Sequence, residues 1–194
     1  MPGYVFSNYL VFCFINAFTP GPGNLLALNT VTNYGIRKGR PLFLGIFTGY
    51  IAVQTICAFF VYAVGTVAPG FLNILKYVGA AYILWLAVHI AVSVPKEESD
   101  RQSASYVKGF LLQLVNVKVF LFGLTALTGF VVEYGKSLPF FLTFGSIVAG
   151  MGILATATWI GLGALIQKFY RKHYRILNII MALTLLECIV SMFR

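Results

Sequence analysis

The chain has 194 residues, of which 59% are hydrophobic and only 10% are charged, and its mean hydropathy is +0.87. Soluble domains usually carry about 25% charged residues, so this composition predicts an integral membrane protein and excludes an ordinary soluble domain. The formal charge of +9 does not predict a nucleic-acid partner, because the basic residues lie in the gaps between apolar runs.

Six apolar segments are long enough to cross a bilayer, which takes about 20 helical residues. They run over about 4–32, 41–66, 71–94, 107–132, 138–166 and 176–193. The sequence therefore predicts an all-α membrane protein with six transmembrane helices in a single transmembrane domain, residues 1–194. A hydrophilic linker, 95–106, separates two halves of three segments each, about 1–94 and 107–194.

The distribution of Lys and Arg predicts how these segments are oriented. The loops after the first, third and fifth segments contain ten of these residues, whereas the opposite side of the membrane has three. We therefore expect the three basic loops, including the central linker, in the cytoplasm and both termini outside.

The first segment is interrupted by the helix-breaking run Pro20–Gly23. A helix that ends near Thr19 exposes unpaired carbonyl groups, and a second half that starts near Asn24 exposes unpaired N–H groups. Pro22 suits the start of a helix because it has no N–H to satisfy. The break is therefore expected to offer acceptors for an ammonium group and donors for a carboxylate, the two charged ends of an amino acid.

Two ionisable residues lie within the apolar segments, Lys118 in the fourth and Glu187 in the sixth. Charged side chains at such depth are costly and mark functional sites by default. At about 1.5 Å per residue both lie about 15–18 Å from the basic side, as does Asn24, near the middle of the bilayer. Lys118 is expected to bind the substrate carboxylate, and Glu187 is the candidate for proton coupling. Structural roles stay open, namely pairing of Lys118 with Glu187 or with helix carbonyls, and contact of Glu187 with Arg194 or headgroups.

The two halves show weak internal similarity. An offset of 100 aligns residues 16–35 with 116–135 and matches five of twenty positions. The matches are Asn16/Asn116, Gly23/Gly123, Val31/Val131, Tyr34/Tyr134 and Gly35/Gly135. Because three spans are an odd number, the second half would be inserted upside down, so the alignment predicts two three-helix inverted repeats. Glycines at 45, 49, 161 and 163 are expected to be close helix contacts.

Four motifs, taken in order, resemble the LysE/RhtB family of amino-acid exporters. They are "TPGPGN" in the first segment, "YGIRKGRPLFLGIFTG" after it, "VGAAYILWLA" in the third segment and "GFLLQLVNVKVFLFG" in the fourth. The chain looks most like the neutral amino-acid branch that exports cysteine and O-acetylserine. The resemblance implies a secondary exporter in the bacterial inner membrane, driven by proton exchange, with six spans; together with the charge distribution, this puts both termini in the periplasm.

The resemblance also implies where the substrate site lies. Residues 19–22 match the family's first motif, and Asn116 and Lys118 match its Asn-Pro-Lys motif. The predicted substrate-binding residues are Thr19, Pro20, Gly21, Pro22, Gly23, Asn24, Asn116 and Lys118. The chain departs from the family at Gly23, where a polar residue is common, and at Val117, where proline is common. We therefore expect a milder second break in the fourth segment.

The sequence thus predicts a transporter and not an enzyme, one that exports small neutral amino acids in exchange for protons by alternating access of its two halves. The expected partners are a zwitterionic amino acid, protons and membrane lipids, without a cofactor, a metal or nucleic acid, and a homodimer is left open. An exporter of acidic metabolites is an alternative, because Lys118 has no certain counter-ion.

A second alternative is a membrane thiol-redox protein that passes reducing equivalents across the bilayer. It would need a nucleophilic and a resolving cysteine close together. Cys13, Cys57 and Cys188 are widely spaced and form no CxxC pair, so only the tertiary fold could bring two of them together.

Overall fold

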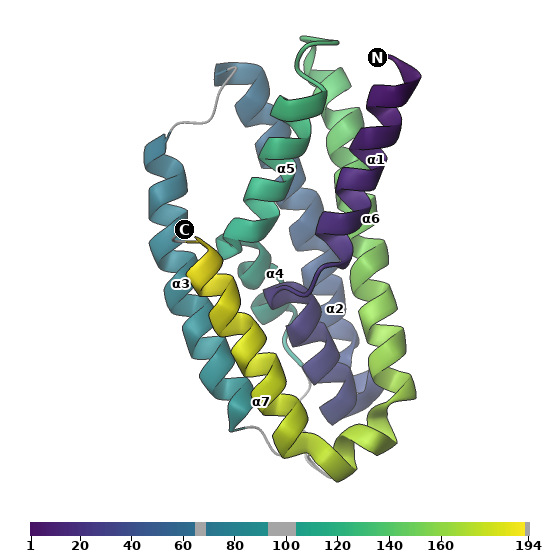
Figure 1. The fold of residues 1–194 in the computed structure, drawn as a ribbon, viewed down its shortest axis with the longest axis vertical. Helices are drawn as coiled ribbons and strands as arrows, with labels where there is room; N and C mark the ends of the chain where they lie inside the picture. Colours follow the sequence, from purple (N-terminus) through teal and green to yellow (C-terminus); the bar gives the residue numbers. More distant parts are fainter. Residues whose placement is uncertain (65–68, 93–103, 193–194) are drawn as a thin grey trace.

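The computed structural model describes residues 1–64, 69–92 and 104–192, which form helices and no strand. The predicted all-α class is thereby confirmed. The helices are α1 (Gly3–Phe18), α2 (Pro22–Val64), α3 (Pro69–Ala91), α4 (Tyr106–Val115), α5 (Val117–Phe130), α6 (Leu138–Leu165) and α7 (Gln167–Met192). They form an elongated bundle, with most helices running along its long axis (Figure 1).

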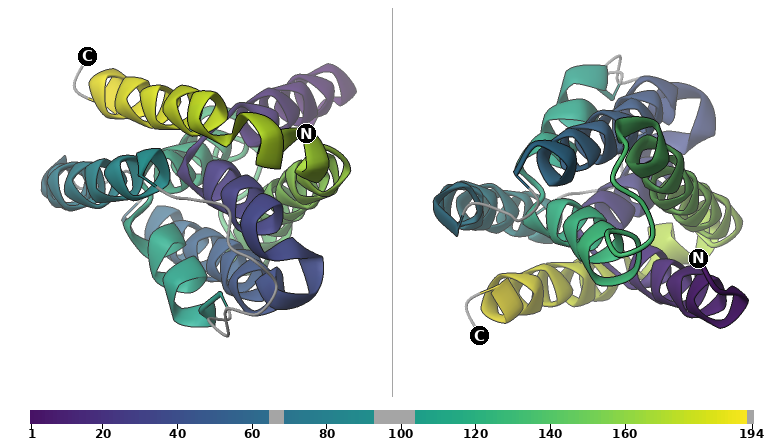
Figure 2. Two further views of the ribbon diagram at one scale, coloured as in Figure 1. Left: turned by 90° about the horizontal axis from the view of Figure 1, so that it is seen from below. Right: turned by 90° about the horizontal axis from the view of Figure 1, so that it is seen from above.

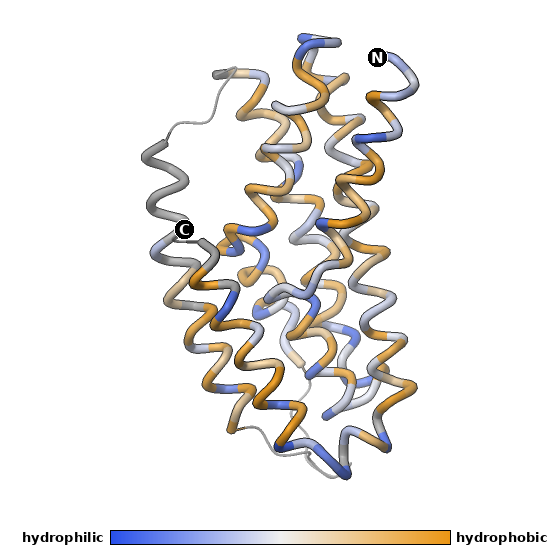
Figure 3. The backbone as a smooth tube through the Cα atoms, in the orientation of Figure 1, coloured by the Kyte–Doolittle hydropathy of each residue, from blue (hydrophilic) through white to orange (hydrophobic). Residues whose placement is uncertain are grey.

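Hydrophobic residues occur along much of the length of the bundle (Figure 3). Large hydrophobic side chains such as Val11, Leu44 and Phe59 are more than half exposed, as suits contact with lipid rather than water. Within the described residues, α2 and α6 are each long and apolar enough to cross a membrane. The bent pair of α4 and α5 could provide a third crossing, and α1 is a shorter apolar helix.

The long helix α2 consists of two helices that meet at Gly35. This glycine has φ 75° and ψ 172°, a conformation that is essentially restricted to glycine. The chain turns back there, at the end of the bundle opposite the N-terminus (Figure 1). Residues 22–34 therefore belong to the first predicted segment, and residues 36–64 form the second.

The described parts of the basic stretches lie at the same end of the bundle as this turn. The Ala104 amide, at the end of the linker, donates to the Lys38 carbonyl at 3.3 Å. The junction between α6 and α7 also lies at this end (Figure 1). The basic residues after the fifth segment belong to α7, which begins at Gln167 and not near 176 as expected, and bends at His173. Residues 95–103 of the predicted linker lie outside the described residues.

Two pairs of helices from different halves of the chain pack along each other. α2 packs along α6 in the centre, and α3 packs along α7. Viewed along the bundle, α3 and α7 project together to one side (Figure 2). One buried apolar cluster joins α1, α2, α5 and α6, and a second joins α3 and α7 to α4 and to residues 22–34.

Glycines set the distance between α2 and α4. A Cβ atom on Gly45 would lie 2.1 Å from the Tyr106 carbonyl oxygen, and one on Gly109 would lie 2.2 Å from the Leu42 carbonyl oxygen. The two backbones therefore touch, as small residues permit between membrane helices. The expected close contacts are confirmed for residues 45, 49 and 163, but the one expected at residue 161 is wrong, since a Cβ there would have no neighbour within 4 Å.

Replacing Gly109 with alanine should destabilise the protein, because the new methyl group forces α2 and α4 apart. Overpacking of this kind typically costs about 1–3 kcal/mol. Gly161→Ala is the matched control, which should be neutral or slightly stabilising because alanine favours an exposed helix. Thermal unfolding of the detergent-purified proteins measures both, and equal melting temperatures for the two variants would contradict the close packing.

Candidate functional site

The predicted break in the first membrane segment is present in the structure. α1 ends at Phe18 and α2 begins at Pro22, so three residues, 19–21, leave the helix. Pro22 occupies the first helical position, where its missing N–H has no cost. The second half therefore starts two residues before Asn24, the position expected from the sequence.

The side chain of Lys118 in α5 reaches across to this break. Its Nζ atom donates to the Thr19 carbonyl at 2.8 Å and to the Pro20 carbonyl at 3.3 Å. Gly21 leaves room for the lysine, since a Cβ there would lie 3.0 Å from Lys118 Cδ. The negative end of the α1 dipole favours a cation at this position. One of the structural roles left open by the sequence, pairing of Lys118 with helix carbonyls, is therefore observed.

The other carbonyls at the end of α1 also accept hydrogen bonds from side chains. Asn24 Nδ2 donates to the Ala17 carbonyl at 3.0 Å, and Trp159 Nε1 of α6 donates to the Phe18 carbonyl at 3.3 Å. The sequence predicted that the break offers its acceptors to the ammonium of a substrate. Each of these carbonyls already accepts a bond from a donor of the protein itself, so a substrate ammonium would have to use the second lone pair of the oxygen; the expected acceptor role stays a prediction.

A second break separates α4 from α5. Only Asn116 leaves the helix there, with φ −82° and ψ 94°, and the two helices are bent by 54° relative to each other. The break is milder than the first, as expected from Val117 in place of proline. The Asn116 carbonyl accepts from the amides of Val119 and Phe120, so α5 continues directly from it.

A chain of buried polar side chains connects the two breaks. Thr156 of α6 donates to Asn24 Oδ1 at 2.8 Å. The Tyr50 hydroxyl of α2 lies close to Thr156 and to Gln113 of α4. Asn116 Nδ2 donates to Gln113 Oε1 at 3.2 Å. All five side chains are at most 5% exposed, so they form a polar core inside an apolar bundle.

Sequence reasoning missed Tyr50, Gln113, Thr156 and the donor role of Trp159. One signal was available for Gln113, which is a polar residue in an apolar helix three positions before Asn116 and therefore on the same face. Tyr50 and Thr156 have no such relation to the breaks in sequence, and only the tertiary fold brings them there.

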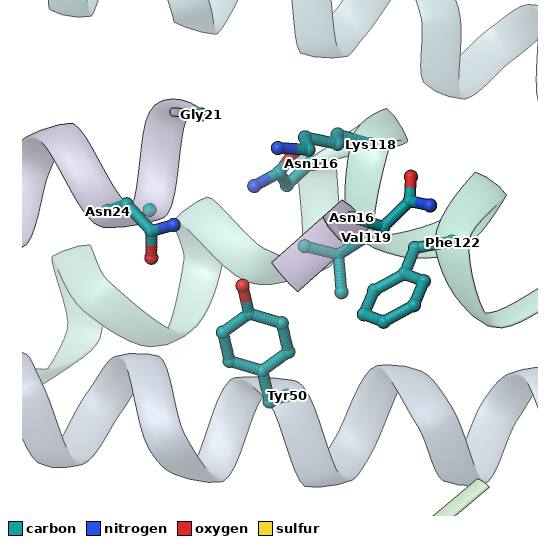
Figure 4. A pocket seen from close by; sticks show the side chains of 9 residues that line it. Asn16, Gly21, Asn24, Tyr50, Asn116, Lys118, Val119 and Phe122 are labelled. Carbon is teal, nitrogen blue, oxygen red and sulfur yellow. The ribbon is translucent and has the colours of Figure 1, made fainter. Parts of the chain in front are cut away.

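A small pocket lies between the two breaks, and the side chains that line it are shown in Figure 4. The lining residues are Asn16, Gly21, Gly23, Asn24, Tyr50, Asn116, Lys118, Val119 and Phe122. They include five of the eight predicted substrate-binding residues. The cavity measures about 10 Å³, which is room for about one water molecule. In this conformation it is too small for an amino acid.

The remaining predicted residues have different positions. Thr19 and Pro20 contribute the carbonyls that hold Lys118, and Pro22 starts α2. Gly23, which lines the pocket, also makes room for Gln113, since a Cβ there would lie 3.0 Å from the Gln113 Oε1 atom. Glu187 lies exposed on α7 and is not among the lining residues of the pocket.

The described cysteines give no support to thiol-redox chemistry. Cys13 and Cys57 are buried and have free thiols. The side chain of Cys188 lies outside the described part of the structure.

Comparison with known proteins shows the family of the chain. Residues 14–190 match the family described as LysE type translocator. The chain is 36% identical over 188 residues to the cysteine/O-acetylserine efflux protein of Escherichia coli strain K12, covering 96% of each chain. It is 35% identical over 194 residues to the protein of the same name in Shigella flexneri, covering 100% of both. No solved structure matches the chain significantly. The chain belongs to the LysE type translocator family, a family of transport proteins.

Proposed function

We propose that the protein exports small neutral amino acids, of the cysteine or O-acetylserine type, across the bacterial inner membrane in exchange for protons. The observation that carries this proposal is the convergence of two broken helices on one buried polar pocket, with Lys118 at its side. Broken helices with polar side chains at their ends are a recurrent way for transporters to build a substrate site. The names of the relatives support an amino acid as the substrate.

Six membrane spans in two inverted halves, about 1–94 and 107–194, fit the order of the helices. The first span would be α1 together with residues 22–34, and the second would be residues 36–64. The third would be α3, and the fourth would be α4 together with α5. The fifth and sixth would be α6 and α7. Two observations support this arrangement. The second helices of the two halves pack together, as do the third helices, and the basic stretches share one end. On the charge rule that end is cytoplasmic, which puts both termini in the periplasm.

Lys118 is the charged residue among those that line the pocket, so it is the candidate to bind the carboxylate of a substrate. The hydrogen bonds from Lys118 to the Thr19 and Pro20 carbonyls hold the ammonium group of the lysine at a fixed point between the two halves. Because the pocket holds only about one water molecule in this conformation, the helices around it must move before an amino acid can enter. Alternating access of the two halves would supply this motion.

Uptake into proteoliposomes tests the proposed function directly. The purified protein should carry labelled cysteine, O-acetylserine or serine, and an imposed proton gradient should increase the flux. Lysine and a dicarboxylate belong in the same panel, because flux of the dicarboxylate alone would instead support export of acidic metabolites. Absence of flux for every neutral amino acid would contradict the proposal.

Substituting Lys118 with methionine should weaken the binding of cysteine by about 10- to 100-fold, the usual worth of a hydrogen bond to a charged group. Lys108→Met is the matched control, because Lys108 lies in the first turns of α4, outside the pocket, and should leave affinity unchanged. Equilibrium binding to the purified proteins measures both. Unchanged affinity in the Lys118 variant would remove this residue as the carboxylate anchor.

The proton-coupling role of Glu187 stays a prediction. The side chain is exposed on α7. If it carries the coupled proton, Glu187→Gln should retain exchange of substrate but lose the response to a pH gradient. Glu133→Gln alters an exposed carboxylate between α5 and α6 and should behave like the wild type. Flux that still responds to the gradient in the Glu187 variant would assign proton coupling to another group.

A further inference from the structure

The side-chain amide of Asn116 donates a hydrogen bond within the protein but accepts none in the described part of the chain. Its Nδ2 atom donates to Gln113 Oε1 at 3.2 Å. Its Oδ1 atom has no hydrogen-bond partner in the described part of the chain, although the residue is 2% exposed. Leaving a buried amide oxygen unpaired is costly, and such atoms in native structures call for an explanation. Asn116 lines the pocket, so a ligand could supply the missing donor.

The ammonium group of an amino acid needs acceptors of this kind. The carbonyls of the first break each accept a bond from the protein already, because Lys118 donates to Thr19 and Pro20 and Asn24 donates to Ala17. Among the lining residues, Asn116 provides a buried side-chain acceptor that is not already satisfied. The second break therefore offers an acceptor without any partner in the described part of the chain, whereas the carbonyls of the first break each have a partner.

We propose that Asn116 Oδ1 accepts a hydrogen bond from the ammonium group of the substrate, while Lys118 binds its carboxylate. This inference rests on the proposed function. Both residues lie at the start of α5, two positions apart, and both line the same pocket (Figure 4). The substrate lies across the second break, and the carbonyls of the first break hold the lysine that binds it.

This arrangement makes Asn116 a specificity-determining residue. A substrate with a free ammonium group pairs the buried Oδ1 atom, whereas an N-acylated amino acid has lost the charge and leaves less room at this point. Sites built to hydrogen-bond a substrate reject analogues that lack the bonding group, because their own buried polar groups then stay unpaired. The protein should therefore prefer cysteine strongly over N-acetylcysteine.

Two substitutions of Asn116 test the proposal, with labelled cysteine binding to the purified full-length protein as the readout. Asn116→Leu removes the acceptor and should lower the affinity about tenfold or more. Asn116→Asp keeps two acceptor oxygens and no donor, so it should retain an affinity within about threefold of the wild type, since the bond made to the ammonium is conserved. If the leucine variant does not fold, Asn116→Ala removes the same acceptor and should show the same loss of affinity.

Competition by N-acetylcysteine provides the readout that a merely structural role would not change. The preference of the wild type for cysteine over N-acetylcysteine should shrink in Asn116→Leu. Asn33→Leu is the matched control, because Asn33 is another buried asparagine with an unpaired Oδ1 atom but lies outside the pocket. It should leave both the affinity and the preference unchanged.

The proposal is overturned if Asn116→Leu binds cysteine as the wild type does, or if Asn116→Asp loses as much affinity as Asn116→Leu. It is also overturned if the leucine variant loses thermal stability alone, since Oδ1 would then hold a structural water. Failure of the wild type to bind any neutral amino acid would instead refute the proposed function, and the two failures are therefore distinguishable.

Discussion

The carbonyl groups at the end of α1 impose the main constraint on this structure. A helix that stops inside an apolar protein leaves its last carbonyls without partners, and no lipid can supply a donor. Here the donors come from three other helices, with Asn24 on α2, Lys118 on α5 and Trp159 on α6. The break therefore fixes how these helices meet. Removing any of the three donors would leave a carbonyl group at the end of α1 without that hydrogen bond. The polar interior and the relation between the two halves both follow from this requirement.

The glycines of the first break have a packing role as well as a helix-breaking one. Gly21 leaves space for Lys118, and Gly23 leaves space for Gln113. Each glycine thus admits a polar side chain from the second half of the chain. Gln113 of α4 lies against Gly23 itself, since a Cβ there would lie 3.0 Å from its Oε1 atom. The second half therefore supplies polar groups to the break in the first half, and Gln113 contacts residues of both breaks.

The sequence predicted those features that depend on local chemistry. The Pro-Gly run gave the break, Val117 in place of proline gave the milder second break, and the depth of Lys118 placed it level with Asn24. The donors to the carbonyls and the chain through Tyr50 and Thr156 could not be predicted, because they depend on which helix faces lie together. Glu187 illustrates the same limit, since distance along a helix gives the depth of a side chain but not the direction in which it points. Its exposed position on α7 follows from packing against α3.

The most direct test of the account is the flux of labelled cysteine through proteoliposomes that contain the variant with Pro20 and Pro22 both replaced by alanine. Alanine favours a continuous helix, so the two half-helices should join and the carbonyls that hold Lys118 should turn to intrahelical partners. We expect the variant to insert into the membrane in normal amounts and to carry no cysteine, while the wild type carries it. Normal flux in the variant would contradict the claim that the broken helix builds the substrate site.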